Sequence, residues 1–246
     1  MKGVVLSRLP AAQLVDLSHE VPHYDVLAGA LLLEACVPWF PRDAVHCAVV
    51  DPGVGTARRP LCVVDPEGRR LVGPDNGLFT PFLGEGARAF ELVSDWGAVP
   101  APQTHARTLS ATFHGRDLFA PVAAWLAAGG DPSWLGPRVE DPVRLSWPGA
   151  THEGGVVRGE VLAADPFGNL LTSVREGDLG RARGLEVQVG GRAARFVRTF
   201  GDGAPGELVA LVGSSGRLEL AVREGSAARA LGPDAHRGSV VLVRGG

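Results

Sequence analysis

The chain of 246 residues is poor in several residue types, and each scarcity excludes a class of protein. Its three cysteines, Cys36, Cys47 and Cys62, are odd in number and show no CxxC spacing. This pattern argues against a disulfide framework and a zinc site, so we expect buried, reduced thiols in a cytoplasmic protein and no bound metal. No stretch approaches the roughly 18 uncharged apolar residues of a membrane span. The first residues do not resemble a secretory signal, so we expect no membrane partner.

Lysine and asparagine are also scarce, and the positive charges do not cluster. Lys2 is the only lysine among 24 basic residues, and the arginines are scattered along a chain of net charge −3. We therefore expect no nucleic-acid partner, because such proteins gather positive charge in patches. Asn76 and Asn169 are the only asparagines, and they lie in the segments GPDNG and DPFGN. Positions that keep a rare residue type are good candidates for a specific role.

Several common catalytic signatures are absent. The chain has no Gly-Lys-Ser/Thr ending of a phosphate loop, no GxGxxG and no GxSxG, which excludes the usual nucleotide loops and the serine elbow of hydrolases. His19 and His23 have the i, i+4 spacing of a metal-binding pair, but Pro22 interrupts the helix that this spacing requires.

Strand-like and helix-like patterns alternate along the first part of the chain. We expect helices at 25–37, at 77–83 and after His114, and strands at 12–19, 44–51, 60–65, 69–75 and 88–94. This alternation predicts an α/β domain over residues 1–145, with a mainly parallel sheet flanked by helices.

The composition changes after about residue 130. Residues 129–150 are rich in proline and glycine and show no periodicity, which is typical of a linker. From residue 155 onward, short valine and leucine runs are separated by glycines. The pattern predicts an all-β domain over residues 146–246, a small barrel or sandwich.

Three polar residues are candidates for a site in the first part. Asp51 ends a predicted strand and opens the tight turn DPGVGT, Arg58 follows that turn, and His114 precedes a helix. Ligands of open α/β sheets bind beyond the carboxyl ends of strands, and these three side chains together could hold and deprotonate a water. Each also has a structural explanation: a turn, a surface ion pair and a helix start.

A second candidate lies in the predicted all-β part. The segment DPFGNLLT combines Asp165, Phe167 and Asn169. An asparagine amide can both donate to and accept from an adenine edge, while the aromatic ring could stack on a base and the carboxylate could bind an ammonium. The alternative is an ordinary Pro-x-Gly turn between strands.

Six segments, taken in order, resemble one known family. They are VDLSHEVPHYDVLAGALLL, FPRDAVHCAVVDPGVGTARRPL, GPDNGL, TFHGRDLFAPVAAWLA, DPFGNLLTS and GSSGRLELAVREGSAA. They resemble the S-adenosyl-L-methionine (SAM) hydroxide adenosyltransferases, which are adenosine-forming SAM hydrolases related to the SAM-dependent fluorinase and chlorinase. The resemblance implies an α/β domain, a C-terminal β-barrel and a homotrimer, with SAM between the N-terminal domain of one subunit and the C-terminal domain of its neighbour.

The resemblance also implies a reaction and its residues. SAM would be hydrolysed to adenosine and L-methionine by in-line attack of an activated water on ribose C5′, with SAM as substrate and no cofactor. Asp51, Arg58 and His114 would hold the water, and Arg116 and Asp117 would support the turn and helix around His114. Substrate-binding roles are implied for Tyr24, Phe113, Asp165, Phe167, Asn169, Phe200, Ser214 and Glu224.

Two alternatives to the hydrolase stay open. One is a SAM-dependent halogenase, which is disfavoured because halogenases carry a Tyr/Thr-bearing version of DPGVGT. The other is a non-catalytic protein that binds SAM or adenosine. Family members place a strand and a ribose-binding aspartate before the segment MKGV, which here begins at Met1. We expect either that the chain starts from an internal position or that it binds SAM weakly.

Overall fold

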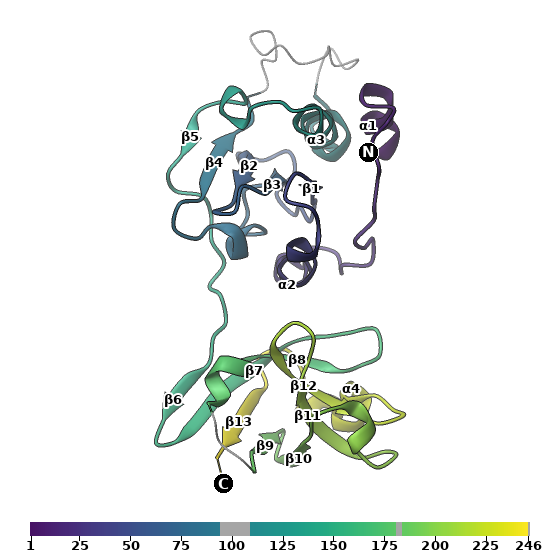
Figure 1. The fold of residues 1–246 in the computed structure, drawn as a ribbon, viewed down its shortest axis with the longest axis vertical. Helices are drawn as coiled ribbons and strands as arrows, with labels where there is room; N and C mark the ends of the chain where they lie inside the picture. The colour runs from purple at the N-terminus through teal and green to yellow at the C-terminus, as the bar shows by residue number, and fades with distance from the viewer. Residues whose placement is uncertain (94–108, 181–183, 246) are drawn as a thin grey trace. The chain divides into compact units, whose positions relative to one another are not determined.

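The computed structural model describes residues 1–93, 109–180 and 184–245, and it divides into two compact units, Met1–Ser146 and Trp147–Gly246 (Figure 1). Among the described residues, no helix has the length and apolar character needed to cross a membrane. Short 3-10 turns occur at η1 (Val37–Trp39), η2 (Thr80–Phe82), η5 (Pro132–Trp134), η6 (Glu176–Leu179), η7 (Phe200–Asp202) and η8 (Gly232–Asp234).

The first unit is built on a five-stranded sheet. Its order is β1 (Val45–Cys47), β3 (Arg70–Pro74), β2 (Pro60–Val64), β4 (Arg88–Glu91) and β5 (Arg138–Val139). Only β1 and β3 run parallel, and the other three pairings are antiparallel. The prediction of a mainly parallel sheet is therefore wrong.

For β2 and β3, the reason is the connection between them. It is a tight turn in which Gly68 N–H donates to Asp65 O at 3.0 Å, and Gly68 has a φ of +85°. Such a turn can only join antiparallel neighbours, because parallel strands need a crossover connection of a dozen or more residues.

The helices of the first unit are α1 (Lys2–Arg8), α2 (Val26–Cys36) and α3 (Ala120–Ala127), and the π-helical turn η4 (Gly115–Phe119) leads directly into α3. Figure 1 shows α2 and α3 on opposite faces of the sheet, with α1 beside α3. Leu118, Phe119 and Val122 pack against Cys62 and Val72 of the sheet in one buried cluster. This packing places His114, which immediately precedes η4, at the end of a firmly anchored helix.

Two predictions for local structure are wrong. Residues 12–19 form no strand, and Leu14 and Val15 are 39% and 67% exposed. Apolar residues of high β-propensity form a strand only where a partner edge pairs with them. Residues 129–150 are not a plain linker, because they contribute β5 to the sheet and Arg144 forms a parallel bridge with Gly77.

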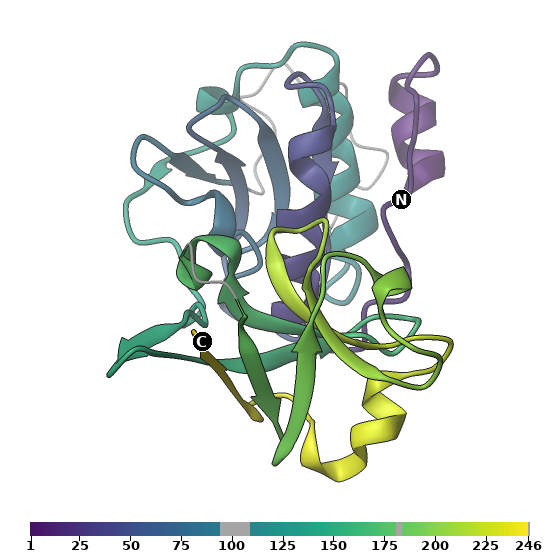
Figure 2. The same ribbon diagram turned by 60° about the horizontal axis from the view of Figure 1, so that its bottom comes forward.

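The second unit is a β-barrel, as predicted. The strands β13 (Val240–Arg244), β9 (Glu186–Val189), β10 (Arg192–Phe196), β11 (Leu208–Val212), β12 (Arg217–Val222), β8 (Leu170–Arg175) and β7 (Val156–Ala164) pair in that order, and β7 pairs back with β13 to close the ring (Figure 2). All these pairings are antiparallel except β10 with β11. The short β6 (Thr151–Glu153) extends β7, and α4 (Ala227–Leu231) packs against the valine- and leucine-rich interior.

Candidate active site

The DPGVGT segment is a compact loop that follows β1. Thr56 Oγ1 donates to Gly53 O at 2.7 Å and accepts from Arg58 N–H at 3.2 Å. Gly55 has a φ of +79°, a region that L side chains rarely adopt. These local bonds fold the loop back on itself, so that its first and last side chains meet.

Asp51 and Arg58 are those two side chains. Arg58 Nε donates to Asp51 Oδ1 at 3.1 Å, and Arg58 Nη2 donates to Asp51 Oδ2. Both side chains are only 6% exposed. The pair is a buried, two-point ion pair, a geometry that the planar guanidinium fork favours.

His114 completes a three-residue cluster. Its Nδ1 lies 3.2 Å from Arg58 Nη2, and its ring meets that of Phe119 edge-on at a centroid distance of 6.5 Å. Arg58 Cζ lies 5.5 Å from the centre of the same Phe119 ring. Because a guanidinium nitrogen can only donate, His114 Nδ1 accepts this hydrogen bond, and the proton of the neutral ring is on Nε2.

One donor of the cluster is unused. Arg58 Nη1 is buried and has no hydrogen-bond partner among the described residues. A buried donor without a partner is rare and costly in native proteins, and it commonly marks a place where a water or ligand binds. The cluster therefore offers one buried donor, at Arg58, to a small hydrogen-bond acceptor.

The neighbours of His114 in the sequence hold its segment in place. Asp117 is 6% exposed and accepts from Ser110 N–H at 3.0 Å and from Arg116 Nε at 2.6 Å. The hydrogen bonds from Arg116 hold the pKa of the Asp117 carboxyl below its ordinary value. Arg116 also lies over the Phe113 ring, at 5.0 Å from its centre. Arg116 and Asp117 thus tie the segment before η4 to the helix start.

The two loops of the cluster approach each other closely at Gly55. A Cβ at this position would lie 2.7 Å from Ala111 O, which is closer than real Cβ atoms come to an oxygen. Only glycine allows the DPGVGT loop to pack this tightly on the segment that carries His114.

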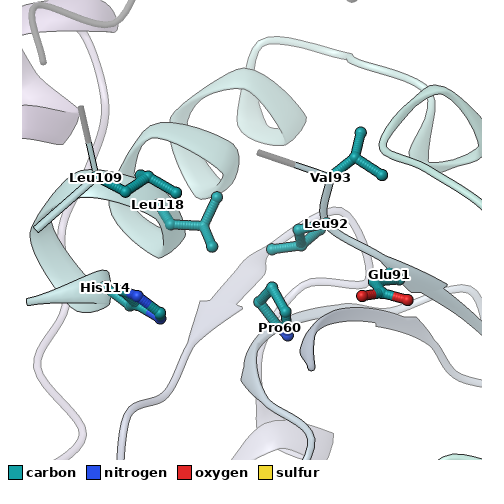
Figure 3. Close-up of a pocket in the computed structure, with 7 residues that line it drawn as sticks. All are labelled: Pro60, Glu91, Leu92, Val93, Leu109, His114 and Leu118. Carbon is teal, nitrogen blue, oxygen red and sulfur yellow. The ribbon is translucent and has the colours of Figure 1, made fainter. Parts of the chain in front are cut away.

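A pocket of about 390 Å³ adjoins His114 (Figure 3). It is lined by Pro60, Glu91, Leu92, Val93, Leu109, His114 and Leu118. Its wall is mainly apolar, and of the predicted site residues it contains only His114. The other lining residues lie within or beside buried strands and helices, where the sequence carries no signal that separates a pocket wall from the core.

The remaining predicted residues of the first unit are exposed. Tyr24 is 77% exposed and Phe113 is 45% exposed. Tyr24 has a φ of +66°, and among the described residues Glu224 of the second unit, with a φ of +56°, is the only other non-glycine residue with a positive φ. Such backbone strain gathers at functional sites.

In the second unit, the DPFGN turn is organised by its aspartate. Asp165 Oδ1 accepts from Phe167 N–H at 2.9 Å and from Asn169 N–H at 2.8 Å, and Asp165 Oδ2 accepts from Asn169 Nδ2 at 2.9 Å. Phe167 is 78% exposed, and this bond uses the nitrogen of the Asn169 amide rather than its oxygen. Phe200, at the start of η7, is 46% exposed.

The structure adds one residue near the predicted substrate-binding residues of the second unit, which the sequence pattern did not single out. Glu219 of β12 lies close to Gly213, which precedes the predicted pocket residue Ser214. Burial, and then the charge of Asp165, raise the pKa of the Glu219 carboxyl. An acidic residue inside the otherwise apolar run LELAV was the available signal.

The chain matches two domain families along most of its length. Residues 1–136 match the SAM hydroxide adenosyltransferase N-terminal domain, and residues 159–238 match the C-terminal domain of the same family. Among solved structures, an uncharacterized conserved protein from Thermotoga maritima has a TM-score of 0.89 and 31% identity, covering 99% of this chain and 93% of that chain.

Named relatives agree with these matches. The (R)-S-adenosyl-L-methionine hydrolase of Thermus thermophilus is 44% identical over 240 residues, covering 94% of this chain and 89% of that protein. The protein of the same name from Salinispora tropica is 45% identical, covering 94% and 86%. A fluorinase of an Actinoplanes species is 30% identical, covering 89% and 84%. The chain therefore belongs to the SAM hydroxide adenosyltransferase family.

Proposed function

We propose that this protein hydrolyses SAM to adenosine and L-methionine, by attack of a water on ribose C5′. Membership of the family and the names of the relatives support this reaction. The observation that carries the proposal is the unused Arg58 Nη1 donor inside the buried cluster of Asp51, Arg58 and His114. A water is the small acceptor that this donor would hold.

The chemistry needs no cofactor. The water oxygen forms a bond to C5′ while the C5′–S bond breaks. The electron pair of the C5′–S bond stays on the sulfur and neutralises the sulfonium, so methionine leaves as a neutral thioether. The O-protonated adenosine then loses its proton to solvent, since a protonated alcohol is a strong acid. The task of the protein is to place the water in line with the C5′–S bond and to exclude bulk solvent.

In this arrangement, Arg58 Nη1 donates to the water and leaves an oxygen lone pair free to attack. His114 accepts from Arg58 Nη2 through Nδ1, so its role is to orient the guanidinium rather than to remove a proton with that nitrogen. Asp51 fixes the guanidinium through Nε and Nη2.

The charge of the cluster favours water over a halide. The Asp51 carboxylate cancels the Arg58 charge, and an imidazole that accepts at Nδ1 is neutral. In a buried site of zero net charge, electrostatic attraction offsets little of the free energy needed to remove water from chloride or fluoride. Hydrolysis is therefore the stronger candidate, and halogenation is the alternative for the experiment to exclude.

For substrate binding we propose the residues that the family resemblance implies. Tyr24, Phe113, Phe167 and Phe200 offer exposed aromatic faces. Asn169 offers an amide oxygen for adenine, and Asp165 offers a carboxylate for the methionine ammonium. The strained backbone of Tyr24 and Glu224 supports their inclusion, and Ser214 stays a prediction. We further propose the homotrimer that the family resemblance implies, in which neighbouring subunits share each site; the four exposed aromatic rings, which a neighbouring subunit would cover, support it. A cytoplasmic location also stays a prediction.

The test is to incubate the purified protein with SAM in ¹⁸O-water, with a parallel sample in excess chloride, and to identify products by mass spectrometry. We expect adenosine labelled at its 5′ oxygen, free methionine and no chlorinated nucleoside. A chlorinated product would instead establish the halogenase. Intact SAM together with measurable SAM binding would establish a non-catalytic binder. Light scattering of the same sample distinguishes a trimer from a monomer.

A further inference from the structure

The segment GPDNG, residues 73–77, lies next to the loop that carries Asp51 and Arg58. Two of its consecutive residues contact the two ends of that loop, Asn76 through its side chain and Asp75 through its backbone N–H. Asn76 Nδ2 donates to the carbonyl oxygen of Val50, the residue before Asp51, at 2.8 Å. Asp75 N–H donates to the carbonyl oxygen of Arg59, the residue after Arg58, at 2.9 Å.

Asn76 needs both halves of its amide. While Nδ2 donates to Val50 O, Oδ1 accepts from Leu78 N–H at 3.2 Å. Leu78 and Val50 both pack against Gly29 of α2, where a Cβ would lie 2.9 Å from Leu78 and 3.0 Å from Val50. The start of the loop is therefore held by a specific donor within a tightly packed surrounding. A carboxylate at position 76 would keep the acceptor and lose the donor.

Asp75 holds the other end more strongly. Its side chain is 2% exposed, and its Oδ2 accepts from Arg59 Nε at 2.8 Å. Its Oδ1 accepts from Val143 N–H at 2.8 Å, and Arg59 Nη1 also binds Asp141 at 2.8 Å. The end of the loop is thus fixed to the segment 141–143 as well as to the sheet.

Resting on the proposed function, we propose that Asn76 and Asp75 are positioning residues that set the separation of Asp51 and Arg58. Their side chains bond to Val50, Leu78, Arg59 and Val143 rather than to the three residues of the cluster. They act by fixing the backbone at Val50 and Arg59, one residue outside each end of the buried ion pair. We call these two backbone contacts, Asn76 to Val50 and Asp75 to Arg59, the clamp. A displacement of about 1 Å in a reacting group can cost about 100-fold in rate, so the clamp matters for turnover more than for substrate binding. It also explains why one of two asparagines lies in GPDNG.

The test compares Asn76→Asp with Thr80→Val. Thr80 is a matched control because its hydroxyl also bridges two backbone groups near this turn, Gly77 O at 2.6 Å and Leu145 N at 2.8 Å, without reaching the 51–58 loop. We expect Asn76→Asp to lower kcat by about 10- to 100-fold with a change in KM of less than about threefold. Thr80→Val should keep kcat within about twofold of wild type. An equal kcat in the two variants would overturn the proposal.

A second readout does not depend on activity. The buried Arg58 Nε–H should give a slowly exchanging ¹H–¹⁵N signal, assigned by its disappearance in Arg58→Lys. We expect this signal to exchange faster in Asn76→Asp and to be unchanged in Thr80→Val. Should wild type not hydrolyse SAM, the proposed function fails, while this signal still decides whether the clamp exists. If Asn76→Asp does not fold, Asp75→Asn replaces it with the same expectations, and an unchanged signal there would refute the clamp.

Discussion

Arg58 and His114 are 56 positions apart in the sequence, yet Arg58 Nη2 lies 3.2 Å from His114 Nδ1. The same guanidinium is bound to Asp51 through Nε and Nη2, so one arginine joins the two loops of the candidate site. This bridge is the basis of the first prediction.

Arg58→Lys should abolish most activity although it keeps the positive charge. A lysine ammonium cannot form the two-point contact with Asp51 and also reach His114. We expect kcat/KM for SAM to fall by at least about 100-fold, and the free energy of unfolding to fall by about 1–3 kcal/mol because buried acceptors lose their donor. Steady-state kinetics and urea unfolding measure both effects.

Arg70→Lys is the control for Arg58→Lys. Arg70 also uses its guanidinium on a buried partner in the first unit, donating to Leu126 O at 2.8 Å, and it lies outside the cluster. The Arg70→Lys variant should have a lower free energy of unfolding and an unchanged kcat/KM. Wild-type turnover in Arg58→Lys would rule out the proposed role of the guanidinium.

Gly55→Ala should disturb the contact between the two loops. The new Cβ would lie 2.7 Å from Ala111 O, so the segment before His114 has to move. We expect kcat to fall by about 10-fold or more. Gly68→Ala introduces a similar backbone strain, at φ +85°, where nothing lies within 4 Å. It should cost stability alone, and equal kcat values for the two variants would contradict the prediction.

Asp165→Asn should weaken substrate binding rather than turnover. The amide would bring a nitrogen into a turn where three donors now converge on a carboxylate, and it would remove the charge proposed for the methionine ammonium. We expect KM for SAM to rise by about 10-fold with kcat nearly unchanged.

Asp178→Asn is the control for Asp165→Asn. Asp178 caps a turn of the same unit by accepting from Arg175 N–H at 2.7 Å and has no proposed contact with substrate. A wild-type KM in Asp165→Asn, or an equal rise in Asp178→Asn, would remove Asp165 from the site.

His46 should make the protein less stable in acid. It is 6% exposed, its Nε2 has no partner among the described residues, and burial followed by the charge of Arg69 lowers its pKa. The unfolded chain keeps the ordinary histidine pKa of about 6.5. Between the two pKa values the unfolded state binds more protons, so stability is full above about pH 6.5 and falls as the pH drops below it.

Replacing His46 should remove this part of the pH dependence. His46→Phe keeps an aromatic ring against Phe40, whose centre lies 5.5 Å away, and it cannot be protonated. Urea unfolding between pH 7 and pH 5 should show a smaller loss of stability than in wild type. His19→Gln, at a side chain that is 78% exposed, should leave the loss unchanged. An identical loss in His46→Phe and wild type would refute the assignment.

The sequence predicted most strands and helices of both units, because their apolar runs and turn residues act locally. The valine and leucine runs between glycines correspond to the barrel strands, and the apolar pattern after His114 corresponds to η4 and α3. Strand direction was predicted less well, since it depends on how strands are connected and paired. Residues 12–19 have a strand-like pattern, but none of the strands that the structure describes pairs with them.

For the candidate site, the sequence by itself determined the residue types: an acid at a strand end, an arginine after a glycine-rich turn and a histidine before a helix. Only the tertiary structure decided that these three side chains touch, that His114 accepts from Arg58, and that Arg58 Nη1 has no partner within the described part of the chain. It also decided that Asn76 and Asp75 hold the two ends of the loop. The physical reason is that a hydrogen bond depends on distances of about 3 Å, and such distances between residues far apart in the chain are set by packing.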